Sequence, residues 1–213
     1  MATQITDGKL RKLNAASGAD KPTQIGSGMS FPVARLIELL EPAQWEEFTE
    51  EWATALKSYK EVERWSGPGD MGRDIVAFTT GMKYDGPWDN YQCKRYALKL
   101  KPSDVWVEVG KIVYYTFKGE FPPPTNYYFA ASKGVGLKLN TLLAEPAKLR
   151  AGLIANWAGY CKTAISNTVE IPLEGALLDY LNKFDFRIFK YKTAGNPGKS
   201  GEIRGNPGKS GTA

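Results

Sequence analysis

The stretch from Trp65 to Tyr96 constrains the fold of this 213-residue chain more than any other. A turn rich in glycine and proline, SGPGDMG, leads into the apolar run DIVAF. A second loop, GMKYDGP, leads into another short run that contains QCK. Short runs bounded by turn residues of this kind predict neighbouring β-strands. Asp74 would then lie near the start of one strand and Lys94 within the next.

Further helices and strands are predicted on both sides of this pair. Residues 60–65, 73–80 and 90–96 together predict an antiparallel meander. Before it, residues 43–59 predict a helix whose buried stripe would consist of Trp45, Phe48, Trp52 and Leu56. The other predicted elements are helices over residues 33–41, 103–119, 146–161 and 172–183, a short helix after Gly136, and strands over 126–132 and 184–192.

We therefore expect one α/β domain over residues 30–192, with a central mixed sheet of four to five strands flanked by helices. Residues 1–29 precede it, and residues 193–213 form a Gly/Ser/Pro/Lys-rich tail that repeats the sequence GNPGKSG. Neither terminal segment has the apolar periodicity that a core requires. We predict a flexible arm and a linker, and the repeat leaves open whether the tail is native.

The absence of histidine excludes several classes of active site. His-based triads, His-ligated zinc and histidine general bases are all ruled out. Cys93 and Cys161 lie far apart and form no CxxC motif. Any metal chemistry must use oxygen ligands, which favours Mg²⁺ or Mn²⁺. No apolar run reaches the roughly 18–20 residues of a membrane helix and no secretory signal precedes the domain, so a cytoplasmic protein is expected.

The net charge of +5 says little about nucleic-acid binding, because most of it lies in the tail. Residues 1–189 carry 23 basic and 22 acidic residues. Local clusters are more informative. Lys94, Arg95, Lys99 and Lys101 follow one another closely, and Arg73 and Lys83 lie nearby in sequence. Such a stripe could contact phosphates, although a solvated basic edge strand is equally compatible for Lys99 and Lys101.

The helix over residues 43–59 carries four glutamates, of which Glu46 is the best candidate for a site residue. At 100° per residue, Glu46 and Glu51 flank the aromatic stripe and Glu47 points most nearly at solvent. Glu50 is the remaining alternative. A solvated acidic face explains any one of these glutamates equally simply.

The order helix-strand-strand-strand-helix-strand, with GDMGRD (residues 69–74) and QCK (residues 92–94), resembles the PD-(D/E)xK nuclease superfamily, specifically its Mrr-type restriction-endonuclease branch. The stretch WEEF (residues 45–48) is similar to the helix-borne glutamate of that family, and NYYFAASKGVG (residues 126–136) is similar to its closing strand and turn. The resemblance covers roughly residues 42–140.

The resemblance implies a restriction-endonuclease-like core and a Mg²⁺- or Mn²⁺-dependent DNA endonuclease. Asp74 would be the central metal ligand, with the Cys93 backbone carbonyl as a second oxygen. Lys94 would stand beside the attacking water. Gln92 occupies a place that is acidic in much of the superfamily, so Glu46 would supply the missing carboxylate. Arg73, Lys83, Arg95 and Lys99 would contact DNA.

The resemblance also implies an effector of bacterial anti-phage defence, with DNA as its partner and a sensor module behind the tail. A homodimer would suit two cuts on two strands. Three alternatives stay open from the residues alone. Asp74 and Lys94 could form an ordinary cross-strand salt bridge, the chain could be a non-catalytic nucleic-acid-binding or assembly module, or the substrate could be RNA.

Overall fold

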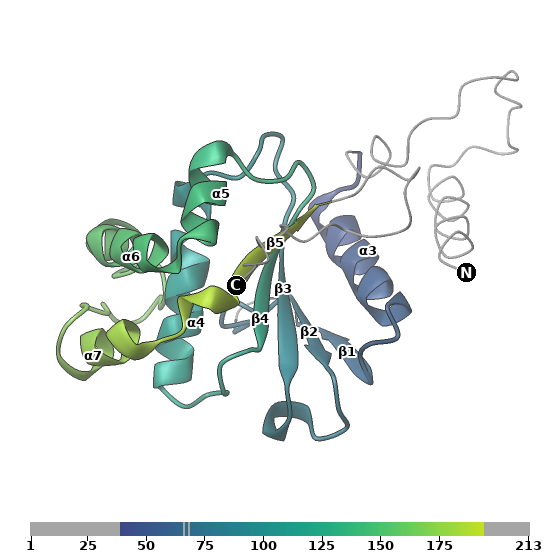
Figure 1. Ribbon diagram of the computed structural model, residues 1–213, viewed down its shortest axis with the longest axis horizontal. Coiled ribbons are helices and arrows are strands. Elements are labelled where there is room, and N and C mark those ends of the chain that lie inside the picture. Colours follow the sequence, from purple (N-terminus) through teal and green to yellow (C-terminus); the bar gives the residue numbers. More distant parts are fainter. Residues whose placement is uncertain (1–38, 66, 68, 194–213) are drawn as a thin grey trace, which may run out of the picture.

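The computed structural model describes residues 39–65, 67 and 69–193, and its centre is a mixed five-stranded sheet (Figure 1). The strands lie in the order β1-β2-β3-β4-β5. The first three strands are antiparallel, whereas β3, β4 and β5 are mutually parallel. The α/β class and the mixed sheet are therefore confirmed. The strands are β1 (Glu61–Arg64), β2 (Ile75–Phe78), β3 (Trp88–Lys94), β4 (Asn126–Ala131) and β5 (Phe189–Thr193).

Helices cover both faces of the sheet. Figure 1 shows α3 against one face, and α4, α5, α6 and α7 on the other side. The helices are α3 (Pro42–Ala55), α4 (Trp106–Phe117), α5 (Leu137–Ala144), α6 (Pro146–Tyr160) and α7 (Gly175–Lys183), with 3₁₀ turns η1 (Lys83–Asp85), η2 (Pro102–Asp104) and η3 (Phe186–Ile188). Within the described residues, no helix combines the length and the apolar character needed to span a membrane.

Helix α4 connects β3 to its parallel neighbour β4, a connection that requires a crossover. Its buried side chains include Val109, Ile112 and Val113, which pack in the same cluster as Tyr127 and Phe129 of β4. Burial of apolar side chains contributes about 1.5–3 kcal/mol each for residues of this size. The crossover therefore holds α4 firmly against the strand ends where Gln92 and Lys94 lie.

Strand alternation assigns the residues of β3 to opposite faces. Tyr91 and Cys93 pack with Ala53 and Trp52 of α3. Gln92 instead contacts Tyr127 on the α4 side, and Lys94 contacts Glu108 of α4. Side chains that meet Lys94 directly must therefore come from the α4 face.

Helix α3 differs in detail from its prediction. The fully buried positions are Trp45, Thr49 and Ala53, spaced i, i+4 and i+8, and the Trp45 indole donates to the Ala130 carbonyl at 2.9 Å. Leu56, predicted to be buried, is 40% exposed because the helix ends at Ala55. The last strand begins at residue 189 instead of 184, since η3 intervenes. Residues 39–41, the end of the helix predicted over residues 33–41, are not helical, and Glu41 is instead the N-cap of α3. Residues 33–38 of that prediction, the arm and almost all of the tail fall outside the described residues.

Candidate functional site

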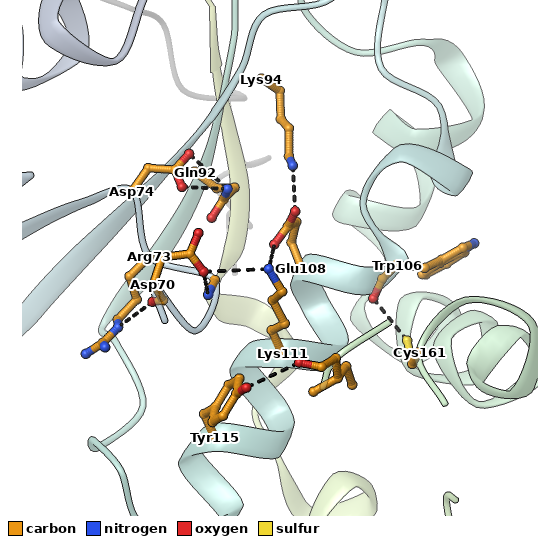
Figure 2. A network of polar contacts seen from close by, with 12 residues as sticks. Asp70, Arg73, Asp74, Gln92, Lys94, Trp106, Glu108, Lys111, Tyr115 and Cys161 are labelled. Carbon is orange, nitrogen blue, oxygen red and sulfur yellow. Dashed lines mark hydrogen bonds and ion pairs between the residues drawn. The ribbon is translucent and has the colours of Figure 1, made fainter. Parts of the chain in front are cut away.

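Asp74 lies directly before β2, and the pairing of Ile75 with Tyr91 places it opposite Gln92. Asp74 is only 7% exposed. Both of its carboxylate oxygens accept hydrogen bonds from Gln92 Nε2 at 2.9 Å, and Oδ2 also accepts one from the Cys93 N–H at 2.7 Å (Figure 2). All of these donors are uncharged. Within the described residues, no cation pairs directly with Asp74.

Burial raises the pKa of Asp74 to about 7. The Cys93 N–H and the positive charge of Lys94 lower this pKa, whereas the negative charges of Glu108 and Glu46 raise it further. Removing a carboxylate from water disfavours its ionised form, and neighbouring carboxylates add to that effect. A divalent cation would relieve both unfavourable contributions. Asp74 is therefore a buried carboxylate whose ionised form is disfavoured by its surroundings.

The Gln92 amide can serve Asp74 in two orientations. Gln92 Oε1 lies 3.1 Å from the Tyr127 hydroxyl, which also lies 3.0 Å from the Gly72 carbonyl. One hydroxyl proton serves only one of these acceptors. With the amide reversed, Nε2 would donate to Tyr127 and Oε1 would face Asp74 at 2.9 Å. Adjacent oxygen ligands of Mg²⁺ are spaced at about 2.9 Å when the metal–oxygen bonds are about 2.0–2.1 Å.

Lys94 is held by a residue that the sequence analysis missed. Its Nζ donates to Glu108 Oε1 at 2.7 Å, and the two side chains are 12% and 13% exposed. Although burial lowers the pKa of Lys94, Glu108 raises it above its ordinary value. Burial likewise raises the pKa of Glu108, but Lys94 and Lys111 hold it below its ordinary value. The simple cross-strand salt bridge between Asp74 and Lys94 is not formed.

The ion pair continues into a chain of alternating charges, Lys94–Glu108–Lys111–Asp70 (Figure 2). Lys111 Nζ lies 3.6 Å from Glu108 Oε2 and 3.6 Å from Asp70 Oδ1. Asp70 is fixed in the turn before β2, where its Oδ1 accepts the Gly72 N–H at 2.8 Å. The chain therefore links the end of β3, helix α4 and the glycine-rich turn.

A signal for Glu108 was present in the sequence. In WVEVGKIVYYTF the only charged residues are Glu108 and Lys111, three positions apart on a largely buried helix. Charged residues in such a helix need partners, because an unpaired charge is costly to bury. The identity of the partner required knowledge of which face of β3 the helix covers.

Glu46 lies on α3, across the sheet from Glu108. It makes no hydrogen bond or ion pair with a described residue. Burial raises its pKa, Arg64 lowers it and Asp70 raises it. Glu46 thus influences Asp74 through its charge without touching Lys94. Among the alternatives, Glu50 pairs with Arg64 at 3.6 Å and Glu47 is exposed, as expected.

The residues around Asp74 suit a cation that keeps much of its water. In the described ranges, no three His, Cys, Asp or Glu side chains converge as a complete metal site. A cation would therefore be held by Asp74, Gln92 Oε1, backbone oxygens and water, a set typical of Mg²⁺. The Cys93 carbonyl faces the same edge of β3 as its N–H, which donates to Asp74. Burial raises the pKa of the Cys93 thiol well above its ordinary value, which disfavours its thiolate form.

Two of the four predicted DNA contacts need correction. Arg73 is 4% exposed, and its guanidinium lies 4.5 Å from the Trp65 ring and 4.1 Å from the Phe121 ring. It also donates to the Tyr84 hydroxyl at 2.7 Å, so it is a structural residue. Lys83 follows the far end of β2 and pairs with two glutamates of β1. It lies at the opposite end of that strand from Asp74.

Arg95 and Lys99 do follow the site, and the structure adds further basic residues beside them. Arg95 is half-buried and donates to the Leu40 carbonyl at 2.7 Å, whereas Lys99 is exposed. A parallel bridge between Leu100 and Val135 joins residues 94–103 to residues 132–144. Neither segment contains an acidic residue. We call their six basic residues the basic rim: Lys94, Arg95, Lys99, Lys101, Lys133 and Lys138.

Comparison of the chain with family models, with curated proteins and with solved structures found no match.

Proposed function

We propose that this chain is a metal-dependent endonuclease that hydrolyses phosphodiester bonds of DNA. The observation that carries the proposal is the buried Asp74 carboxylate, which has only neutral donors while Lys94 stands beside it on the same face of the sheet. The element order α3-β1-β2-β3-α4-β4 supports the finer assignment of a restriction-endonuclease-like core, because the resemblance to Mrr-type nucleases rests on that order.

Each residue has a chemical role in this proposal. A divalent cation, when bound, would neutralise phosphate charge and acidify a bound water. Asp74, the Cys93 carbonyl and Gln92 Oε1 would hold it. The Lys94 ammonium would orient the attacking water or stabilise the charge that develops on the phosphoryl group. Glu46 would act through its charge, because it touches neither Asp74 nor Lys94.

The basic rim is the proposed contact for the DNA backbone. It begins at Lys94 and includes three exposed lysines, Lys99, Lys101 and Lys138, on two joined segments, an arrangement that suits successive phosphates. Arg95 and Lys99 keep their proposed role within it, and Lys101, Lys133 and Lys138 join them. An anti-phage role, a sensor behind the tail, a homodimer and a cytoplasmic location stay predictions from the sequence.

One observation favours the alternative of a non-catalytic nucleic-acid-binding module. Both oxygens of Asp74 already accept hydrogen bonds, and Lys94 is already paired with Glu108. A site satisfied in this way could be a structural remnant of a nuclease. DNA binding by the basic rim would then be the whole function.

Plasmid cleavage with Mg²⁺ or Mn²⁺ separates these functions. We expect wild-type protein to nick or cut DNA, Asp74→Ala to lower the rate about 1,000-fold and Lys94→Ala about 100-fold. Lys83→Ala is the matched control, because Lys83 is a paired lysine remote from Asp74. An RNA of the same sequence tests the substrate class.

Two outcomes would overturn the proposal. Wild-type protein that shifts DNA on a gel but never nicks it would favour the binding module. Asp74→Ala and Lys94→Ala variants that cut like wild type would place the chemistry elsewhere in the chain.

A further inference from the structure

Lys94 and Glu108 form a short, largely buried ion pair. The two groups come from different elements, approach to 2.7 Å and are each nearly nine-tenths buried. Exposed ion pairs of similar length on this chain, such as Lys162 with Glu170, leave one side chain 63% exposed. Burying both charges is unfavourable unless the pair is well positioned, so such a pair contributes more to geometry than to stability.

Strand alternation explains why Glu108 meets Lys94. Lys94 and Gln92 project from the α4 face of β3, and Asp74 meets Gln92 on that same face. Lys94 therefore has two carboxylates within electrostatic reach, Asp74 and Glu108, and it contacts only Glu108.

The rest of the charge chain keeps Glu108 in place. Lys111 lies on the other side of the Glu108 carboxylate and is itself 3.6 Å from Asp70. Glu108 Oε2 is buried and accepts no hydrogen bond from a described residue. Oε2 can therefore accept a further hydrogen bond. The position of the Glu108 carboxylate depends on Lys94 and Lys111.

From this geometry, and resting on the nuclease function proposed above, we propose that Glu108 is a positioning residue of the site. Its carboxylate holds the Lys94 ammonium on the α4 side, apart from Asp74. Besides Glu108, Asp74 is the carboxylate whose charge acts on Lys94, and an Asp74–Lys94 pair formed without Glu108 would occupy both groups at once. Glu108 thereby leaves the Asp74 carboxylate open to a cation and keeps Lys94 aimed at the substrate. It supplies the fixed negative charge that Gln92 cannot provide.

The test compares Glu108→Gln, Glu108→Asp and a control, Glu170→Gln, which removes an exposed pair of the same 2.7 Å length. Single-turnover cleavage at saturating DNA measures the chemical step, and DNA affinity is measured separately with Ca²⁺. We expect Glu108→Gln to slow cleavage on the order of 100-fold with DNA affinity within about threefold of wild type. Glu108→Asp keeps the charge and should recover about a tenth of the wild-type rate, whereas Glu170→Gln should match wild type.

A second readout needs no activity. Limited acetylation followed by mass spectrometry compares Lys94 with Lys148, whose side chain is 63% exposed. Lys94 should react far more slowly than Lys148 in wild type and several-fold faster in Glu108→Gln than in wild type, because the variant lacks the carboxylate to which the ammonium donates at 2.7 Å.

The outcomes separate this inference from the proposed function. If wild type cleaves and Glu108→Gln cleaves equally well, Glu108 has no positioning role, although the nuclease function stands. If wild type does not cleave, the nuclease function fails, and unchanged acetylation of Lys94 in Glu108→Gln would overturn the inference as well. Should Glu108→Gln fail to fold, Glu108→Asp decides: cleavage at the full wild-type rate would contradict the account.

Discussion

Asp74 and Asp89 are equally buried, at 7% exposure each, but their hydrogen-bond partners and neighbouring charges differ. Asp89 accepts hydrogen bonds from the Tyr59 hydroxyl at 2.7 Å and from Asn126 Nδ2 at 2.8 Å. Asn126 in turn accepts a hydrogen bond from Lys190 at 2.6 Å. Donors from the loop after α3, from β4 and from β5 thus converge on one end of the sheet, and the Lys190 ammonium completes the network. This arrangement is what a structural carboxylate requires.

Both oxygens of Asp74 also accept hydrogen bonds, but the charges of Glu46 and Glu108 disfavour its ionised form. Lys94, whose charge favours that form, is paired with Glu108. The two aspartates therefore differ in their partners: the network of Asp89 ends in Lys190, whereas the donors to Asp74 are uncharged and two carboxylates act on it. Carboxylates arranged against one another's ionisation are typical of functional sites, although structural networks also perturb pKa values. Substituting each aspartate by asparagine tests this comparison directly.

The largest expected difference is in cleavage. Asp74→Asn should lower the rate of plasmid cleavage with Mg²⁺ about 1,000-fold, because an amide cannot replace a carboxylate as the central metal ligand. Asp89→Asn should stay within about threefold of wild type, since Asp89 makes its contacts at the other end of β3. Equal loss in both variants would mean that cleavage depends on folding alone.

The next effect concerns pH. The pKa of Asp74 is raised from 3.8 to about 7 in the folded protein. The folded state therefore binds more protons than the unfolded state between these values, so the carboxyl group opposes folding increasingly as pH rises from about 4 to 7. Relative to Asp74→Asn, wild type should lose up to about 4 kcal/mol of unfolding free energy over that window. Urea unfolding of both proteins at pH 4.5 and pH 8 measures this difference in unfolding free energy. An equal change with pH in wild type and in Asp74→Asn would contradict the raised pKa of Asp74.

A smaller effect of opposite sign is expected at Asp89. Tyr59 and Asn126 each donate a hydrogen bond to one carboxylate oxygen of Asp89. Asp89→Asn replaces one of these acceptor oxygens with an amide group, which is itself a donor. A buried donor left without an acceptor destabilises by about 1–3 kcal/mol. Asp74→Asn incurs a similar penalty at Gln92 or Cys93, but removal of a carboxylate whose ionisation opposes folding by up to about 4 kcal/mol outweighs it. Urea unfolding at pH 8 should therefore show Asp89→Asn below wild type and Asp74→Asn above it. If both variants are destabilised alike, the distinction between the two aspartates is wrong.

The smallest effect is expected at Lys83. Its two ion pairs with Glu61 and Glu63 are solvent-exposed, and such pairs contribute little. Lys83→Gln should leave both the urea midpoint and cleavage unchanged. A clear loss of DNA affinity in this variant would restore the role in DNA contact that its position argues against.

Local sequence predicted that Asp74 lies near the start of one strand and Lys94 on the next, because turn residues and short apolar runs define neighbouring strands. It did not predict the register that places Gln92 opposite Asp74. It did not predict Glu108, since the identity of that partner depends on which face of β3 the helix α4 covers. Arg73 was misjudged for a related reason. Near Asp74 in sequence it resembles a phosphate contact, but Phe121, far along the chain, helps to bury it.

The most direct test of the central claim is thermal unfolding at pH 8 with and without millimolar Mn²⁺, for wild type, Asp74→Asn and Asp89→Asn. A ligand that binds only the folded state raises its stability. We expect Mn²⁺ to raise the Tm of wild type and of Asp89→Asn by several degrees and to leave that of Asp74→Asn unchanged. An equal rise in all three proteins, or no rise in wild type, would contradict a cation site at Asp74.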